Sequence, residues 1–139
     1  AIGTDGCASN NDLDMFSENR TAAILAKAVA NDATALDAAT TLRAATLGGA
    51  RALGFGDRIG SIEVGKQADL ACVDLSALET QPLHHVLSQL VYAAGRHQVS
   101  DVWIAGQPKL VQRELVGMDV AAITANARQW RDRIRSIRA

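Results

Sequence analysis

The stretch Ile59-Gly60-Ser61-Ile62-Glu63-Val64-Gly65-Lys66, followed by Leu70-Ala71-Cys72-Val73, decides the fold class of this protein. Apolar Ile62 and Val64 alternate with other residues between glycines, which is the period of a strand. The second stretch is a continuous apolar run, typical of a buried strand. Because the residues before this region have a helical period, the sequence predicts an α/β chain in which a helical segment is followed by strands of a buried sheet.

Two helices are predicted before the strands. Residues 14–30 are alanine-rich, with acidic residues near the start and a lysine near the end, where each charge favours the helix dipole. Thr34, with Asp37 three residues later, resembles a capping box and predicts a second helix over about 35–46. The pair Gly48-Gly49 is expected to interrupt this helical pattern.

The second half of the chain alternates helix and strand. We expect a helix over 83–94 and strands over 99–104 and 109–116, with Gly106-Gln107 between the strands as a type II′ hairpin turn. Residues 119–138 predict an amphipathic helix. Its apolar stripe comprises Ile123, Ala127, Trp130, Ile134 and Ile137.

Composition and charge restrict the class of protein. The 139 residues are 48% hydrophobic and 21% charged, the balance of a globular domain rather than a disordered chain. A formal charge of -1 and the lack of a long apolar run argue against nucleic-acid and membrane partners, and the arginines of the last helix indicate a solvated face. Cys7 and Cys72 cannot form a disulfide framework, which favours a reducing, cytoplasmic location.

Asp5 is the main candidate for chemistry. It follows a short apolar start and precedes Gly6, so it lies where a strand would end and a loop begin. In a (β/α) barrel that position faces the catalytic mouth. From spacing alone, an aspartate that hydrogen-bonds its own loop is the favoured interpretation. The polar side chains of residues 6–14 are typical of an active-site loop and equally of a solvated helix entry.

Three motifs resemble the amidohydrolase superfamily, and they follow one another along nearly the whole chain. GTDGCASNNDLDMF (residues 3–16), followed by RTAA (20–23), is similar to the last barrel strand and following loop of one branch of that superfamily. That branch contains the 5-methylthioadenosine/S-adenosylhomocysteine deaminases and the triazine chlorohydrolases. ATLGGARALG (45–54) lies at the expected distance, and GSIEVGKQADL (60–70) resembles a segment of the small β-sandwich that is widespread in the superfamily.

The resemblance implies a metal site to which this chain supplies one ligand. Such enzymes hold one divalent metal, usually zinc, through a His-x-His pair, further histidines and an aspartate that ends the last barrel strand. Asp5 matches that aspartate, which binds the metal and takes a proton from the attacking water. The histidines His84, His85 and His97 match none of the family's ligand positions. We therefore expect a C-terminal fragment that by itself holds no metal.

The fold implied by the resemblance is the C-terminal end of a metal-dependent (β/α)8 barrel, most of the small β-sandwich and a C-terminal helix. Residues 1–56 would contain the end of the last barrel strand and barrel helices. Residues 57–118 would form the sandwich portion with an inserted helix, and residues 119–139 the amphipathic helix. We expect the missing N-terminal part of the same protein, or self-association, to cover the exposed apolar faces.

The function implied for the parent is hydrolytic deamination of an adenosine derivative, 5-methylthioadenosine or S-adenosylhomocysteine, by hydroxide bound to the metal. A triazine chlorohydrolase or aminohydrolase is the alternative within the class, because both reactions replace a ring substituent at an amidine-like carbon. An alternative of another class is that the chain alone is a non-catalytic folding or assembly module. Bound metal distinguishes an enzyme from such a module.

Overall fold

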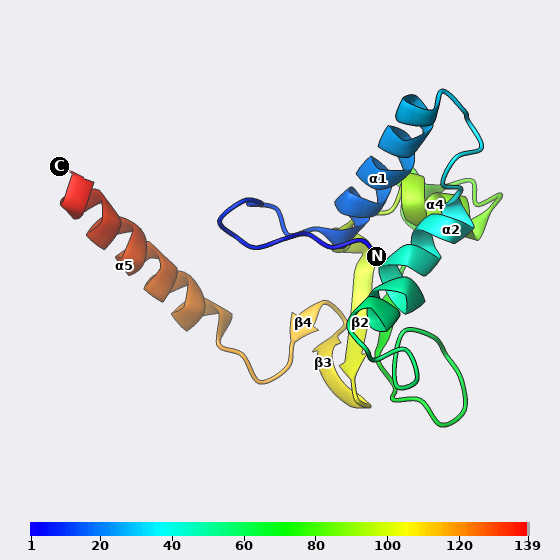
Figure 1. The fold of residues 1–139 in the computed structure, drawn as a ribbon. Coiled ribbons are helices and arrows are strands. Elements are labelled where there is room, and N and C mark those ends of the chain that lie inside the picture. Colours follow the sequence, from blue (N-terminus) through cyan, green and yellow to red (C-terminus); the bar gives the residue numbers. More distant parts are fainter. Residues whose placement is uncertain (139) are drawn as a thin grey trace.

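The computed structural model describes residues 1–138 as a mixed helix and strand chain. Its helices are α1 (Met15–Ala30), α2 (Ala38–Arg43), α3 (Gly49–Ala52), α4 (Val86–Tyr92) and α5 (Val120–Arg138), with a π-helical turn at Ala44–Gly48 and 3-10 turns at Leu78–Thr80 and Arg96–Gln98. Its strands are β1 (Leu70–Val73), β2 (Val99–Ile104), β3 (Gln107–Val111) and β4 (Glu114–Leu115). Figure 1 shows α1, α2 and α4 lying together, while α5 projects away from the rest of the chain.

Helix α1 begins and ends at local capping residues. The Asp14 side chain accepts a hydrogen bond of 2.9 Å from the backbone N–H of Phe16 and caps the first turn. Asn31 ends the helix in the left-handed conformation, with φ at 49°. The predicted helix over 14–30 is confirmed.

Helix α2 begins later than the capping box predicts. Asp37, not Thr34, is the N-cap, and its carboxylate accepts a hydrogen bond of 2.7 Å from a backbone N–H in the first turn. Thr34 instead donates its backbone N–H and hydroxyl to the carboxylate of Asp32. The helix expected over 35–46 therefore begins at Ala38, because the stronger local cap stands three residues further on.

The pair Gly48-Gly49 does not interrupt the helix, contrary to expectation. The chain passes from α2 through the π-helical turn at 44–48 directly into α3, which ends at Ala52. A Cβ atom at Gly48 would lie 3.1 Å from the carbonyl oxygen of Arg43. Glycine at position 48 therefore avoids a close contact in the π-helical turn. The helix continues through both glycines into α3.

The strands form one antiparallel sheet in the order β1-β2-β3-β4. Leu70 on β1 pairs with Trp103 on β2, so the predicted strands at 70–73 and 99–104 are confirmed. The expectation that the sheet is buried is wrong for β1, where Ala71 and Cys72 are exposed. The helices α1, α2 and α4 pack on one another instead of covering this strand.

The turn between β2 and β3 differs by one residue from the prediction. Ala105 and Gly106 are its two central residues, with φ values of 49° and 76°, and Ile104 pairs with Gln107 across it. Two positive φ values define a type I′ turn rather than type II′. Gln107 is thus the first residue of β3.

The strand expected over 109–116 is divided into β3 and β4. Gln112 and Arg113 have φ values of 49° and 68°, which make a second two-residue turn. Val111 pairs with Glu114 across this turn. The prediction was wrong here because neither turn residue is a glycine or asparagine.

Residues 59–66 form a loop instead of the predicted strand. Gly60 and Gly65 have φ values of 91° and 93°, and Ile62 and Val64 are almost fully exposed. No strand of residues 1–138 pairs with this stretch. A strand is stable only when a neighbouring strand hydrogen-bonds to it. The alternation of apolar and other residues was therefore not sufficient to make this stretch a strand.

The hydrophobic core lies where α1, α2 and α4 meet. Ala23, Ala38 and Val91 are buried there, and Leu87 and Tyr92 are partly buried against them. Small side chains let the helices approach closely, but each removes little apolar area from water. The core inside this chain is consequently small.

Helix α4 is shorter than the expected helix over 83–94. His85 is its N-cap, with Nδ1 accepting a hydrogen bond of 3.2 Å from the backbone N–H of Ser88. Ala93 follows Tyr92 with φ at -120°, outside helical geometry. The cap at His85 sets the start of α4, and the non-helical conformation of Ala93 sets its end.

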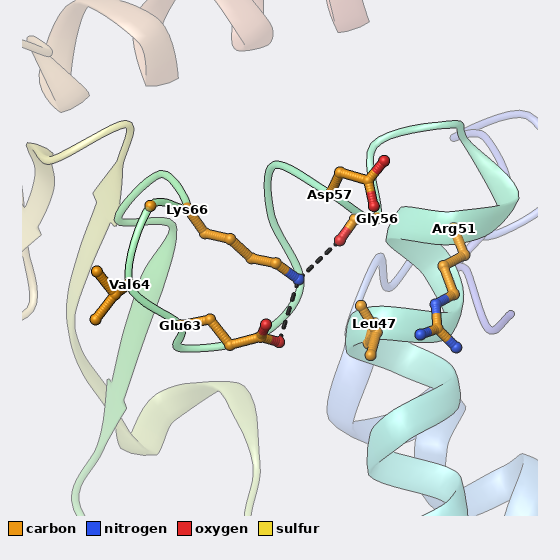
Figure 2. A pocket seen from close by; sticks show the side chains of 8 residues that line it. Leu47, Arg51, Gly56, Asp57, Glu63, Val64 and Lys66 are labelled. Atoms are coloured by element: carbon orange, nitrogen blue, oxygen red, sulfur yellow. Dashed lines mark hydrogen bonds and ion pairs between the residues drawn. The ribbon is translucent and has the colours of Figure 1, made fainter.

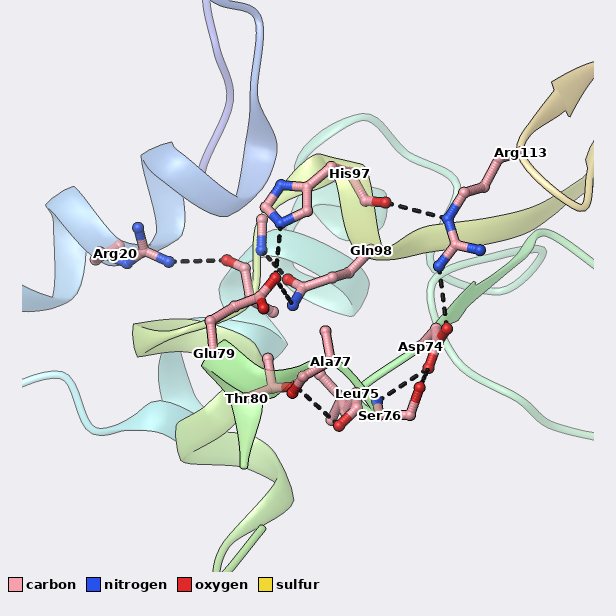
Figure 3. A network of polar contacts seen from close by, with 12 residues as sticks. Arg20, Asp74, Leu75, Ser76, Ala77, Glu79, Thr80, His97, Gln98 and Arg113 are labelled. Atoms are coloured by element: carbon pink, nitrogen blue, oxygen red, sulfur yellow. Dashed lines mark hydrogen bonds and ion pairs between the residues drawn. The ribbon is translucent and has the colours of Figure 1, made fainter. Parts of the chain in front are cut away.

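A polar network connects the turns on either side of α4 (Figure 3). The fully buried hydroxyl of Thr80 donates a hydrogen bond of 2.8 Å to the carbonyl oxygen of Leu75. Glu79 accepts contacts of 3.4 Å from His97 and from the buried Gln98. These contacts fix the turn at Arg96–Gln98 relative to the turn at Leu78–Thr80.

Helix α5 confirms the amphipathic helix predicted over 119–138. The Asp119 carboxylate accepts a hydrogen bond of 2.9 Å from the N–H of Ala122 in the first turn. Trp130 and Ile134 on the apolar stripe are 55% and 49% exposed. Across residues 1–138, the helices are too short or too polar to cross a membrane.

Candidate functional site

The loop between the N-terminus and α1 places Asp5 in a constrained and exposed position. Asp5 has φ at 59°, in the left-handed region that aspartate tolerates better than most residues. One carboxylate oxygen accepts a hydrogen bond of 2.7 Å from the N–H of Gly6, and the other accepts one of 2.8 Å from the hydroxyl of Ser9. The sequence spacing predicted that Asp5 hydrogen-bonds groups of its own loop, and the structure contains these hydrogen bonds.

These contacts set the protonation state of Asp5. The Ser9 hydroxyl, and after it the Gly6 N–H, stabilise the charged carboxylate and hold the pKa of Asp5 below its ordinary value of 3.8. Asp5 is therefore ionised at neutral pH. An exposed, ionised carboxylate is chemically suited to bind a divalent cation.

The rest of the loop is attached to α1. The Asn10 amide donates a hydrogen bond of 2.7 Å to the carboxylate of Glu18, while its oxygen accepts one of 3.0 Å from the N–H of Asp12. The surplus of polar side chains in this loop thus serves to hold its shape. A further contact comes from Arg96, 84 residues away along the chain, which the sequence did not indicate.

The described residues do not assemble a complete metal site. No group of three or more histidine, cysteine, aspartate or glutamate side chains is placed within 1–138 to hold a metal ion. His85 caps α4, and His97 lies 3.4 Å from Glu79. The role of Asp5 as a metal ligand stays a prediction, and residues 1–138 do not bring further ligands together around a common metal position.

A polar pocket of about 410 Å³ lies elsewhere, between α3 and the loop that follows it (Figure 2). The Lys66 ammonium donates a hydrogen bond of 2.7 Å to the carbonyl oxygen of Gly56 and lies 3.3 Å from the carboxylate of Glu63. Leu47 and Arg51 line the helical side. Because the Lys66 ammonium already has these two partners, we interpret the pocket as the place where the loop packs against the helix, with a structural role.

The chain is similar to one protein family and to curated proteins of that family. Residues 1–109 match the amidohydrolase family. The 5-methylthioadenosine/S-adenosylhomocysteine deaminase of Teredinibacter turnerae is 48% identical over 134 residues, which are 96% of this chain and 30% of that protein. The enzyme of the same name from Halobacterium salinarum is 46% identical over 93% of this chain and 30% of its own length. The chain spans about 30% of the length of these curated relatives.

The solved structures similar to this chain include two zinc-containing enzymes. An adenosine deaminase from Xanthomonas campestris with bound zinc is 93% identical with a TM-score of 0.96, covering 98% of this chain and 31% of its own. The atrazine chlorohydrolase of Arthrobacter aurescens, complexed with zinc, is 29% identical with a TM-score of 0.73, covering 87% of this chain and 27% of its own. Together with the family match over 109 residues, these similarities identify the chain as a member of the amidohydrolase family.

Proposed function

We propose that this chain is part of a longer metal-dependent hydrolase that deaminates an adenosine derivative, 5-methylthioadenosine or S-adenosylhomocysteine. The similarity to curated deaminases of that name, at 48% identity over 96% of the chain, carries the proposal. The zinc-containing adenosine deaminase at 93% identity supports both the metal and the purine substrate. All these relatives support amidohydrolase-type hydrolysis.

Asp5 is the residue of this chain to which we assign the chemistry. Its carboxylate is ionised and exposed, so it can serve as one ligand of a divalent metal, for which zinc is our proposal. When bound, zinc lowers the pKa of water to about 7 and polarises the substrate. Asp5 would hold the proton that the water gives up, as a carboxylate general base does. The remaining ligands would come from residues of the longer protein outside this chain.

The segments of the chain have separate roles in this proposal. Residues 1–56 would contribute the end of the last barrel strand and barrel helices, and residues 57–118 part of the small β-sandwich with its inserted helix α4. Residues 119–139 would add the C-terminal helix. The free thiols Cys7 and Cys72 support a cytoplasmic location, because thiols persist in reducing compartments.

Triazine hydrolysis is the second candidate. The structural similarity to atrazine chlorohydrolase, with a TM-score of 0.73, supports it. The lower identity of 29% makes it the weaker of the two. A third possibility, that the isolated chain is a non-catalytic folding or assembly module, draws its support from the incomplete ligand set of residues 1–138.

The test uses the longer protein that contains this chain. Zinc content is measured by elemental analysis, and release of ammonia from 5-methylthioadenosine is compared with release of chloride from a chlorotriazine. We expect about one zinc per chain and turnover of the nucleoside only. Turnover of the triazine alone would establish the second candidate, and a protein with neither metal nor turnover would support the module.

A further inference from the structure

The loop that carries Asp5 is held at two separate points. It extends from the rest of the chain between the N-terminus and α1 (Figure 1). At the first point, the amide of Asn10 donates to Glu18 on α1, which is only eight residues away. At the second point, Arg96 contacts Asp12 across 84 residues of sequence.

The second contact is a double one. The Arg96 Nη1 atom lies 2.6 Å from the backbone carbonyl oxygen of Asp12 and 2.9 Å from its carboxylate. Both side chains are more than half exposed, at 61% for Arg96 and 52% for Asp12. An exposed ion pair alone stabilises little, but a charged donor to a backbone carbonyl also restrains the path of the chain.

Arg96 is itself well anchored. It opens the 3-10 turn at Arg96–Gln98, where the Gly95 N–H donates a hydrogen bond of 2.7 Å to the side chain of Gln98. Gln98 is 2% exposed, so this turn is fixed from inside the protein. The following residues form β2, which pairs with β1 on one side and β3 on the other. Arg96 therefore connects the Asp5 loop to an inner strand of the sheet.

The position of Asp5 depends on the shape of this loop. Within residues 1–138, its carboxylate bonds only to groups of the same loop, Gly6 and Ser9, so a shift of the loop moves the carboxylate with it. A displacement of about 1 Å at a reacting group can lower a rate by about a hundredfold. A contact that holds the loop is consequently expected to affect catalysis without touching the substrate.

We propose that Arg96 is a positioning residue for the metal-ligand carboxylate, acting through its double contact with Asp12. The proposal rests on the function assigned above to Asp5. Glu18 holds the same loop from the side of α1, and Arg96 supplies the connection to the sheet. Because both side chains of the pair are more than half exposed, we expect loss of Arg96 to leave the fold intact and to release the loop at Asp12, while the contact between Asn10 and Glu18 remains.

The first experiment measures the loop directly in the longer protein that contains this chain. Amide hydrogen exchange of residues 6–13 is compared between the natural chain and the variants Arg96→Gln and Arg131→Gln. Arg131 is the matched control, because it also forms an exposed ion pair, 2.8 Å from the Asp132 carboxylate, and lies on α5, outside both the Asp5 loop and the turn at Arg96–Gln98. We expect exchange in the loop to rise about fivefold in Arg96→Gln and to stay unchanged in Arg131→Gln. Equal exchange in all three proteins would show that Arg96 does not hold the loop and would overturn the proposal.

The second experiment tests positioning in the zinc-loaded longer protein. We expect Arg96→Gln to lower kcat by about tenfold and to speed zinc loss, with KM changed by less than about twofold. Arg96→Lys keeps a charged donor and should recover most of kcat. A normal kcat and normal zinc retention in Arg96→Gln would overturn the proposal, as would an equal loss in Arg131→Gln.

A parallel variant separates the two possible failures. If Asp5→Asn keeps its zinc and its turnover, the function assigned to Asp5 is wrong, and the role of Arg96 falls with it. If Asp5→Asn loses them and Arg96→Gln does not, only the role of Arg96 is overturned.

Discussion

The guanidinium of Arg20 on α1 donates a hydrogen bond of 2.8 Å to the carbonyl oxygen of Ala94, just after α4 (Figure 3). Ala94 is fully buried, so its carbonyl has little access to water. This bond joins two helices that are distant in sequence. It also fixes Ala94, the residue that precedes Gly95-Arg96. The bond therefore helps to hold Arg96, which contacts Asp12 in the Asp5 loop.

Removing this donor should destabilise the helical part of the chain. We predict that Arg20→Leu lowers the free energy of unfolding by about 1–3 kcal/mol, because a buried carbonyl loses its charged partner. Urea denaturation of the variant and of Arg20→Lys, which retains a charged donor, measures the change. A loss below about 0.5 kcal/mol in Arg20→Leu would contradict the prediction.

The sheet should lose stability in acid through Asp74. The Ser76 hydroxyl and N–H, followed by the Arg113 guanidinium, lower the pKa of Asp74 to about 2 from its ordinary value of 3.8. A lowered folded-state pKa stabilises the protein fully above the ordinary value, and this contribution is lost as the pH falls from 3.8 through about 2. Asp74→Asn should therefore be less stable than the natural chain at neutral pH, and the difference should shrink below pH 3.8 and disappear below about pH 2. A stability difference independent of pH would refute this explanation.

The isolated chain should associate through α5. Trp130 and Ile134 are about half exposed on one stripe of this helix, and exposed apolar surface of this kind favours association. We predict that light scattering gives a mass that rises with concentration. The double variant Trp130→Gln and Ile134→Gln should reduce this rise, whereas Arg135→Gln, outside the stripe, should not. A single-chain mass at every concentration would show that the stripe does not associate.

The isolated chain should also bind zinc weakly. Residues 1–138 offer Asp5 without a group of three ligands, and zinc sites in proteins normally have at least three. Equilibrium dialysis followed by elemental analysis measures the binding. One tightly held zinc per chain would contradict the assignment of the other ligands to the longer protein.

The sequence predicted elements whose signals are local. The charges near the ends of residues 14–30 and the strand signals at 70–73 and 99–104 act within a few residues, and the structure places a helix and two strands there. The strand expected over 59–66 is absent because a strand also requires a pairing neighbour, which is not encoded in its own residues. The turn at Gln112-Arg113 was missed because its residues carry no turn signal.

The candidate site was predictable only in part. Asp5 came from a motif that resembles a known family, and its contact with Ser9 lies within that motif. Arg96 lies 84 residues from Asp12, and an arginine in a polar turn has no sequence feature that specifies its partner. Contacts of this kind become visible only when the chain is folded.

The most direct test of the account is the effect of Asp5→Asn on the longer protein. Asparagine preserves the shape of the side chain but removes the charge that would bind zinc and hold a proton. We predict that the variant loses zinc and that kcat for 5-methylthioadenosine falls by at least about a hundredfold, while the surface variant Asp57→Asn retains both. Full zinc content and a kcat near that of the natural protein would show that Asp5 only shapes its loop.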